Sequence, residues 1–250
     1  MTSAADKKQR LDRELVERQL VESREKAQAL ILAGKVLVDG QLSDKPGRAV
    51  SRSSSIDVQQ PQRFVSRGGL KLEAALDRFG ISVEGRVCMD VGTSTGGFTD
   101  CLLQHGAARV HAVDTGAGQI HWKLRTDARV VLHENTNARH LTLSDIGEQV
   151  ALIACDVSFI SVTLLIPALA PVLRGDGDWV ILVKPQFEVG RERVGKGGIV
   201  RNPEAQQWAC GRVQNSMSAA GFETGIIDSP ILGAEGNREF LLHGWRNALR

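Results

Sequence analysis

Residues 85 to 100 read Gly-Arg-Val-Cys-Met-Asp-Val-Gly-Thr-Ser-Thr-Gly-Gly-Phe-Thr-Asp. The apolar run 87–91 carries an acid, Asp90, near its end and leads into a turn that contains Gly92, Gly96 and Gly97. This pattern predicts a strand, a glycine-rich loop and the start of a helix. Glycine lets the backbone bend sharply and approach a ligand, and free N–H groups at a helix start face that ligand. An ordinary turn between a strand and a helix fits the same glycines about equally well.

The residues around the loop limit the class of ligand that it could bind. No lysine follows Gly97, so the spacing is not that of a phosphate-binding P-loop, and it is a poor dinucleotide fingerprint. A second acid, Asp114, ends the next apolar run. Two acids beside such a loop suit a ligand with an amino-acid end and a ribose, which favours S-adenosylmethionine. The residues expected to contact it are Asp90, Gly92, Thr95, Gly96, Gly97, Asp114, Glu134 and Asn137.

The composition is that of a soluble globular protein. Of the 250 residues, 42% are apolar and 24% are charged, which allows one large domain or a medium domain with a small companion. No apolar run approaches the length of a membrane-spanning helix, and residues 1–10 lack the apolar segment of a secretory signal. We therefore expect a cytoplasmic protein without a membrane partner.

The four cysteines are scattered singly, without a C-x-x-C pair or clustered histidines. We expect no metal site and interpret Cys88 and Cys155, which lie in apolar runs, as small buried hydrophobic residues.

Basic character is concentrated at the front of the chain. Residues 1–80 hold 15 lysines and arginines against 11 acids, whereas residues 81–250 hold 16 against 18. Apolar spacing predicts a helix over residues 10–20 and a second helix that begins after Ser23 and stops at Gly34. A strand then enters a hairpin at Asp39-Gly40. The front is therefore a helix pair with a small sheet, and a polyanionic partner should meet this end first.

Three strings in this region resemble the small RNA-binding domain of a small-subunit ribosomal protein, tyrosyl-tRNA synthetases and pseudouridine synthases. They are Arg-Leu-Asp at 10–12, Ser-Arg-Glu-Lys-Ala at 23–27 and Gly-Lys-Val-Leu-Val-Asp-Gly at 34–40. The resemblance implies that basic residues of the second helix and its flanks contact RNA. These are Arg10, Arg13, Arg24, Lys26 and Lys35. Without the resemblance, a solvated basic face would explain the same charges.

A polar connection interrupted by a proline, residues 59–66, marks the domain boundary. We expect a small RNA-binding domain at 8–60, a linker at 61–66 and a second domain at 67–250. The second domain opens on a helix that buries Leu72, Ala75, Leu76 and Phe79, with Lys71 off that stripe.

From residue 86 onward, strand-like and helix-like segments alternate. Strands are expected near 86–91, 109–114, 129–133, 150–156, 178–184, 222–228 and 238–244. Alternation predicts a mainly parallel sheet with helices on both faces, and the short connection at 229–237 makes the last two strands antiparallel neighbours. This is the α/β arrangement of class I S-adenosylmethionine-dependent methyltransferases, preceded here by the small α+β domain.

Four charged residues are placed to meet at one edge of this sheet. Asp156 and Lys184 end the fourth and fifth strands, Glu239 opens the antiparallel seventh, and Lys71 comes from the helix before the first. Methyl transfer to a ribose hydroxyl needs that hydroxyl oriented and its proton removed, and Lys184 is our choice for this role. Its protonation state stays open. A helix cap for Asp156 and a surface ion pair for Glu239 are the structural alternatives.

Longer strings carry a second resemblance, over essentially the whole chain. They are Ser66–Lys71, Asp90–Asp100, Asp156–Ser161, Val183–Glu188, Lys196–Arg201 and Gly236–Phe240. Together they resemble the TlyA family, also called hemolysin A, of FtsJ-like type. The resemblance implies 2′-O-methylation of cytidine in ribosomal RNA, S-adenosylmethionine as donor and a catalytic tetrad matching Lys71, Asp156, Lys184 and Glu239. The segment 63–66 is similar to the family's linker, so Arg63 and Arg67 join the expected RNA contacts.

Two rival functions remain: a membrane-lysing protein, as the hemolysin label suggests, and an inactive RNA-binding assembly factor. The loop Glu188 to Asn202 either clamps RNA or is a disordered crossover. We expect a monomer. The target nucleotide, the ribosomal subunit and any need for RNA in cofactor binding stay open.

Overall fold

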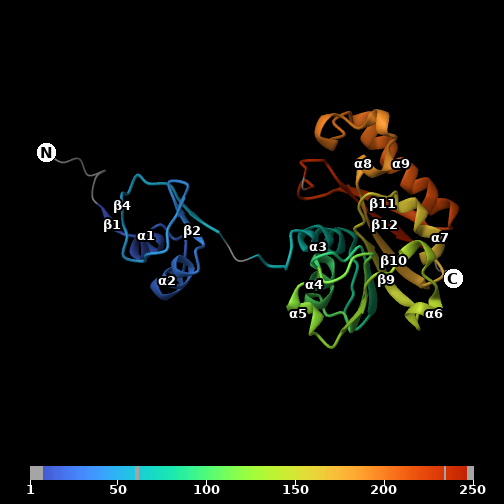
Figure 1. The fold of residues 1–250 in the computed structure, drawn as a ribbon, viewed down its shortest axis with the longest axis horizontal. Helices are drawn as coiled ribbons and strands as arrows, with labels where there is room; N and C mark the ends of the chain where they lie inside the picture. Colours follow the sequence, from blue (N-terminus) through green and yellow to red (C-terminus); the bar gives the residue numbers. More distant parts are fainter. Residues whose placement is uncertain (1–7, 60–61, 234, 247–250) are drawn as a thin grey trace. The chain divides into compact units, whose positions relative to one another are not determined.

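The computed structural model describes residues 8–59, 62–233 and 235–246. The chain divides into two compact units, residues 1–62 and 63–250 (Figure 1). Parts of the expected boundary, residues 60 and 61, lie outside the described residues, as do both chain ends.

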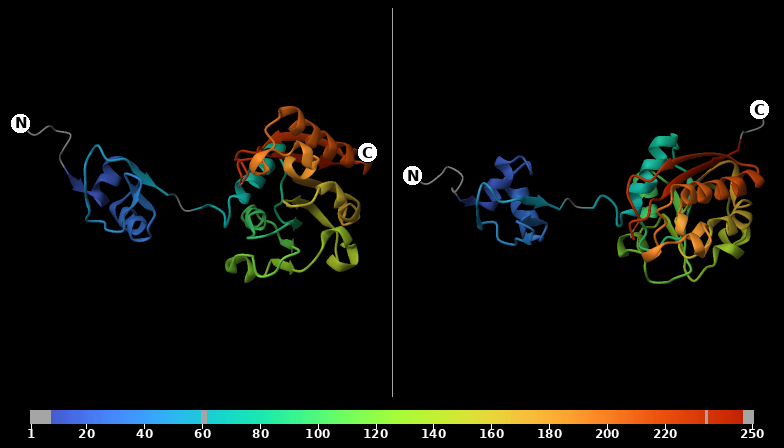
Figure 2. Two further views of the ribbon diagram at one scale, coloured as in Figure 1. Left: turned by 45° about the horizontal axis from the view of Figure 1, so that its top comes forward. Right: turned by 90° about the horizontal axis from the view of Figure 1, so that it is seen from above.

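The first unit packs two helices against short strands, which lie beside them in Figure 2. Ser23 begins the second helix as expected, since its hydroxyl oxygen accepts a hydrogen bond from the Lys26 N–H. Leu11, Leu15 and Ile31 are fully buried in the core between the helices and the strands. The elements are β1 (Gln9–Arg10), α1 (Leu11–Glu17), α2 (Arg24–Leu32), β2 (Val36–Val38), β3 (Gln41–Leu42), β4 (Ala49–Val50) and β5 (Ile56–Val58).

The predicted hairpin joins β2 to β3. Asp39 and Gly40 both have positive φ, 52° and 76°, which the tight two-residue turn of a hairpin requires. The strands form a three-stranded sheet in the order β3-β2-β5, and β1 pairs with β4 separately.

The second unit is built on a seven-stranded sheet in the order β11-β12-β10-β9-β6-β7-β8. Its strands are β6 (Val87–Val91), β7 (Arg109–Val113), β8 (Val130–His133), β9 (Val150–Cys155), β10 (Leu173–Val183), β11 (Glu223–Asp228) and β12 (Phe240–Trp245). β12 runs antiparallel to both of its neighbours, β10 and β11, and the remaining pairs are parallel. The predicted sheet, six parallel strands with an antiparallel seventh, is confirmed.

Helices cover both faces of this sheet (Figure 1). One face packs against α3, α4 and α5, and the other against α6, α7 and α9. Alternate residues of β6 serve both layers, with Cys88 in one core and Met89 in the other. The helices are α3 (Gly68–Phe79), α4 (Gly97–Gln104), α5 (Trp122–Arg125), α6 (Leu143–Ile146), α7 (Ile166–Leu169), α8 (Pro185–Glu188) and α9 (Pro203–Ala219).

The fifth strand begins earlier than the sequence predicts. β10 starts at Leu173 and its pairing with β9 shifts register between Leu173 and Asp178. Gly175 and Gly177 lie in this stretch, and glycines within a strand are a signal of such irregularity. Cys88 and Cys155 are buried, as predicted, and so are the other two cysteines, Cys101 and Cys210; all four are free thiols. Burial raises the pKa of the Cys88 thiol to about 12.

Candidate active site

The four charged residues predicted at the sheet edge do meet there. Asp156 follows β9 and Lys184 follows β10, whereas Glu239 precedes β12. Because β12 is antiparallel to β10, it starts at the edge of the sheet where β10 ends. Lys71 reaches the same edge from α3, which packs beside β12. Although the sequence places it off the apolar stripe of α3, Lys71 is only 8% exposed and is buried with the residues of that stripe.

Two ion pairs make up this tetrad. Lys71 Nζ lies 2.5 Å from Glu239 Oε2, and Lys184 Nζ lies 2.6 Å from Asp156 Oδ1. Lys184 Nζ also donates a hydrogen bond of 2.8 Å to Ser158 Oγ. The Lys71–Glu239 side chains are nearly closed off from solvent, at 10% and 3% exposed, whereas Asp156 is 23% exposed. The Lys184–Asp156 pair is therefore the more accessible side of the tetrad.

The glycine-rich loop comes close to this tetrad. Gly92 has a φ of +86°, and a Cβ placed on it would lie 2.4 Å from the Asp156 main-chain oxygen. No other residue fits that position without moving the end of β9. Gly96 is constrained likewise, since an added Cβ would lie 2.3 Å from a Leu124 methyl group. These two glycines allow the loop to approach the end of β9 and Leu124 closely, and approach to a ligand stays a prediction.

A cavity of about 450 Å³ lies beyond the loop, within the size range of sites for small molecules. Of the predicted cofactor residues, Gly92, Asp114 and Asn137 line it. Asp114 is tied to the loop, because its carboxylate accepts hydrogen bonds from the Ser94 and Gly116 N–H groups, at 2.8 and 2.7 Å. A carboxylate and an amide in one cavity suit the hydroxyl and amino groups of a nucleoside.

A second cavity of about 310 Å³ is lined by all four tetrad residues. The predicted loop residues Gly92, Thr95 and Gly97 line it as well. The two cavities share Gly92, Ser94, Asp156 and Ser158. A ligand in the first cavity would therefore lie next to a second ligand held at the tetrad.

Three of the predicted cofactor residues, Asp90, Gly96 and Glu134, line neither of these two cavities. Asp90 is fully buried below the loop, where its Oδ2 accepts hydrogen bonds from the N–H and hydroxyl of Thr99 in α4. Burial raises the pKa of Asp90 to about 7, despite these hydrogen bonds. Glu134 instead accepts hydrogen bonds from Arg125 and from the Gly118 N–H. Cofactor contact by all eight predicted residues stays a prediction.

Comparison with known proteins assigns the chain to a family. Residues 64–246 match the model of the FtsJ-like methyltransferases, and residues 9–56 match that of the S4 domain. The chain belongs to the FtsJ-like methyltransferase family. The 16S/23S rRNA (cytidine-2′-O)-methyltransferase TlyA of Mycobacterium tuberculosis is 47% identical, over 93% of this chain and 88% of that protein. Hemolysin A of Brachyspira hyodysenteriae is 43% identical, over 94% and 98% respectively.

Solved structures agree with this assignment. A candidate hemolysin from Streptococcus thermophilus is 42% identical with a TM-score of 0.74, covering 98% of this chain and 90% of that one. A methyltransferase from Mesorhizobium loti that depends on S-adenosylmethionine shares the fold, with a TM-score of 0.52 at 16% identity, over 69% and 96%. The predicted resemblance and fold class are confirmed, and the FtsJ-like chain uses S-adenosylmethionine as its cofactor.

The S4 domain holds its predicted RNA-binding residues in different ways. Arg10 and Arg24 both bind the buried Asp12 carboxylate, at 3.0 and 2.9 Å, and the hydrogen bond from Arg10 holds the pKa of Asp12 well below its usual range. Lys26 pairs with Glu22 at 2.9 Å. Arg13 and Lys35 are exposed and, within the described part of the chain, take part in no ion pair. Of the five basic residues predicted in this domain, these two are therefore the ones whose charge is not already paired with an acid in the described residues.

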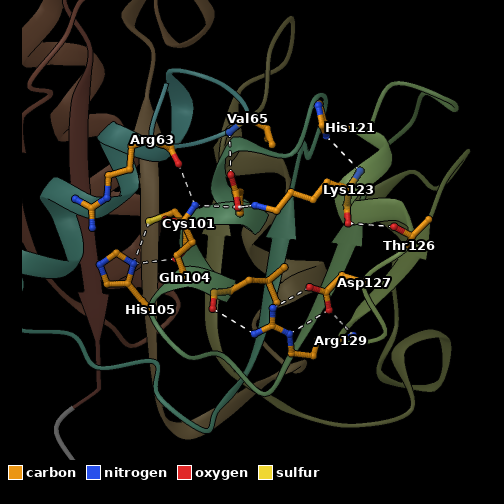
Figure 3. Close-up of polar contacts among 12 residues, drawn as sticks. Arg63, Val65, Cys101, Gln104, His105, His121, Lys123, Thr126, Asp127 and Arg129 are labelled. Atoms are coloured by element: carbon orange, nitrogen blue, oxygen red, sulfur yellow. Dashed lines mark hydrogen bonds and ion pairs between the residues drawn. The ribbon is translucent and has the colours of Figure 1, made fainter. Parts of the chain in front are cut away.

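The start of the methyltransferase unit is tied down at the predicted linker (Figure 3). Gln104 Nε2 of α4 donates to the Arg63 main-chain oxygen at 3.0 Å, and the Val65 N–H donates to Asp100 at 2.8 Å. Lys123 lies 3.6 Å from the same Asp100 carboxylate. The side chain of Arg63 pairs with Glu73, while Arg67 is exposed and lines the second cavity. Arg67 is thus the nearer of the two arginines to the tetrad.

Sequence reasoning missed two residues at this site. Phe159 has a φ of +65° and is 92% exposed, although it lines the first cavity and its ring lies 5.3 Å from that of Phe187. Glu188 is the reverse, a carboxylate that is only 2% exposed. Both belong to strings that carry the family resemblance, but their exposure and backbone angles are visible only in the structure.

Proposed function

We propose that this chain methylates the ribose 2′-hydroxyl of cytidine in ribosomal RNA, in one or both ribosomal subunits. The relative from Mycobacterium tuberculosis, which matches almost the whole chain, is named for that reaction. The observation that supports it most directly is that the first cavity, where we place the cofactor, and the second cavity, which the tetrad lines, share Asp156 and Ser158. We call them the cofactor cavity and the tetrad cavity. A methyl donor in one cavity would then lie next to an acceptor hydroxyl in the other, as an in-line transfer requires.

The tetrad supplies the groups that such a reaction needs. S-adenosylmethionine, when bound, supplies a methyl group that is open to attack by an oxygen. Lys184 Nζ is held 2.6 Å from Asp156 and 2.8 Å from Ser158, on the accessible side of the tetrad. We assign it to orient the 2′-hydroxyl and either to accept its proton or, as a cation, to stabilise the developing alkoxide, while the C–O bond forms and the bond between sulfur and the methyl carbon breaks. We propose that the buried Lys71–Glu239 pair, which lines the same cavity, positions the ribose.

Phe159 is the group best placed to hold the target base. A bulky residue with positive φ is strained, and such strain persists mainly at functional sites. An aromatic ring that is 92% exposed beside the cofactor cavity offers a face for stacking. We propose that the cytosine of an extruded nucleotide stacks on it, since base and aromatic ring then replace two solvated surfaces.

The S4 domain is proposed to bind folded ribosomal RNA through its exposed cations, Arg13 and Lys35. Arg10, Arg24 and Lys26 would add to the positive electrostatic potential of this domain. Arg63 and Arg67 would supply further cations for RNA at the linker. We propose that the protein acts as a monomer in the cytoplasm, where ribosomal RNA is found.

The hemolysin label of two relatives leaves membrane lysis as a second candidate. None of the helices in the described residues is long and apolar enough to cross a membrane. A liposome-leakage assay separates the two functions, because leakage that rises with protein concentration would support lysis.

Replacement of Lys184 tests the proposed mechanism. We expect Lys184→Ala to lower methylation of unmodified ribosomal subunits by about 100-fold or more while the Tm stays near that of the wild type. Arg174→Ala, which removes an exposed ion pair outside both cavities, is the control and should keep full activity. Full activity of folded Lys184→Ala would show that the assigned role is wrong. Lys184→Arg keeps a cation but cannot accept the proton. Retained activity would therefore indicate that Lys184 acts as a cation, and lost activity that it accepts the proton.

A further inference from the structure

Two segments that meet at the active site are joined by three successive contacts. We call residues 156–162, which follow β9, the catalytic loop. Lys184, at the start of α8, contacts Asp156 and Ser158. One turn of α8 further on, the Phe187 ring lies 5.3 Å from that of Phe159. At the end of α8, Glu188 binds the far end of the loop.

Both carboxylate oxygens of Glu188 are used at that end. Oε2 accepts a hydrogen bond from Ser161 Oγ at 2.6 Å, and Oε1 accepts one from the Val162 N–H at 2.8 Å. These distances are those of strong hydrogen bonds to a charged acceptor. Ser161 and Val162 begin a 3₁₀ turn, Val162–Leu164, so Glu188 fixes the point where the catalytic loop ends.

Fold stability alone does not account for an acid at this position. Glu188 is 2% exposed and, among the described residues, forms no ion pair through its carboxylate. Arg212 Nη1 donates to the main-chain oxygen of Glu188 at 2.5 Å, and its charge lowers the pKa of the Glu188 carboxyl by less than burial raises it. Burial raises the pKa of Glu188, which means that its charged form is disfavoured there. A neutral or apolar residue would cost less to bury, so the carboxylate has a use other than filling space.

The contacts indicate what that use is. Helix α8 has only four residues, Pro185–Glu188, so its two ends move together. Holding Glu188 therefore holds Lys184, and the same carboxylate holds the loop that carries Asp156 and Phe159. The positive φ of Phe159 also requires a loop that is fixed at both ends.

We infer that Glu188 is a positioning residue, which sets the distance between Lys184 and the catalytic loop by binding Ser161 and Val162. This inference rests on the proposed methyl transfer at the tetrad. Without the two hydrogen bonds, α8 and the loop separate, Lys184 loses its register with Asp156, and the reacting hydroxyl is misplaced.

Steady-state kinetics on unmodified ribosomal subunits test it with three variants. We expect Glu188→Ala to lower kcat by about 10-fold to 100-fold, because small misplacements of reacting groups have effects of that size. KM for the subunits should change less than about twofold, since RNA binding by the S4 domain is untouched. Glu188→Gln should recover most of kcat, because its amide oxygen still accepts from Val162 and its NH₂ group can donate to Ser161. Glu84→Ala, which removes an exposed acid outside both cavities, is the control and should match the wild type.

Unchanged kcat in folded Glu188→Ala would overturn the inference, and so would an equal loss in Glu188→Ala and Glu188→Gln. If Glu188→Ala does not fold, Ser161→Ala removes one of the two hydrogen bonds and should still lower kcat several-fold, whereas unchanged kcat would count against the inference.

Hydrogen exchange of the Val162 amide and its neighbours gives a readout without RNA. It should accelerate in Glu188→Ala or Ser161→Ala, and unchanged exchange would overturn the inference even if the wild type failed to methylate ribosomal RNA.

Discussion

Asp90 combines complete burial with a carboxylate oxygen, Oδ1, that has no hydrogen-bond partner among the described residues. Its pKa of about 7 lies above the ordinary value of 3.8, so the folded state holds a proton that the unfolded state releases. The protonated Asp90 carboxyl therefore contributes its full stabilisation below about pH 4, and this contribution is lost as the pH rises through 7.

A neutral substitute should remove this pH dependence. We expect the free energy of unfolding of the wild type, measured relative to that of Asp90→Asn, to fall by up to about 1.4 kcal/mol per pH unit between pH 5 and 7. Urea unfolding of both proteins at pH 5, 6, 7 and 8 measures the difference and cancels the titration of other groups. Parallel curves for the two proteins would show that Asp90 titrates normally.

For Phe159, stability and activity should move in opposite directions. Phe159→Gly relieves the strain of a positive φ, so we expect an unchanged or higher Tm. Loss of base stacking should lower kcat/KM by about 5-fold to 150-fold, which corresponds to about 1–3 kcal/mol. Phe159→Tyr keeps the ring and is the control. A Phe159→Gly protein with wild-type kcat/KM would rule out the stacking role.

The tetrad could be predicted from the sequence because each member stands at a strand end or on a neighbouring helix, and topology brings those positions together. Glu188 and Phe159 could not. Their roles depend on a carboxylate being buried and on a ring being exposed, which is the reverse of what each residue type usually does. The burial of Lys71 was missed for a related reason, since its partner Glu239 is 168 residues away.

At the scale of elements, the glycine loop offers a matched comparison. Gly92 and Gly147 have nearly equal φ, +86° and +84°, but a Cβ on Gly147 would meet nothing within 4 Å. Gly147→Ala therefore suffers backbone strain alone, about 1 kcal/mol, and should bind S-adenosylmethionine normally.

Gly92→Ala adds a clash with the end of β9, next to Asp156. We expect it to weaken cofactor binding at least 10-fold, as measured by calorimetric titration. Equal affinity of the two variants would show that the close approach of loop and strand does not shape the site.

The strands of the sheet were predictable because buried parallel strands are short apolar runs between turn signals. The early start of β10 was not, because Arg174 and Asp176, with the two glycines beside them, read as a loop. Its pairing there depends on the neighbouring strand.

At the scale of the whole molecule, the chain joins an S4 unit to an FtsJ-like unit, each with its own core. Sequence reasoning found both units because their strings are long. It did not show which basic residues of the S4 unit are left unpaired for RNA, since Arg10 and Arg24 meet Asp12 only in the folded domain.

That difference predicts how RNA binding responds to salt. Arg13→Ala and Lys35→Ala should each weaken binding to ribosomal RNA and lower the slope of log Kd against log salt by about one. Lys45→Ala, at an exposed lysine outside the predicted set, serves as the control and should keep the wild-type slope. Binding titrations at four salt concentrations supply the slopes. Wild-type slopes in both variants would argue against RNA contact by these residues.

The most direct measurement is the transfer of labelled methyl groups from S-adenosylmethionine to unmodified ribosomes and isolated subunits, followed by mapping of 2′-O-methyl positions. We predict labelled cytidine in the RNA of one or both subunits, and label lower by about 100-fold or more with Lys184→Ala. Absence of label in every ribosomal species, with cofactor binding confirmed by calorimetry, would contradict the proposed function.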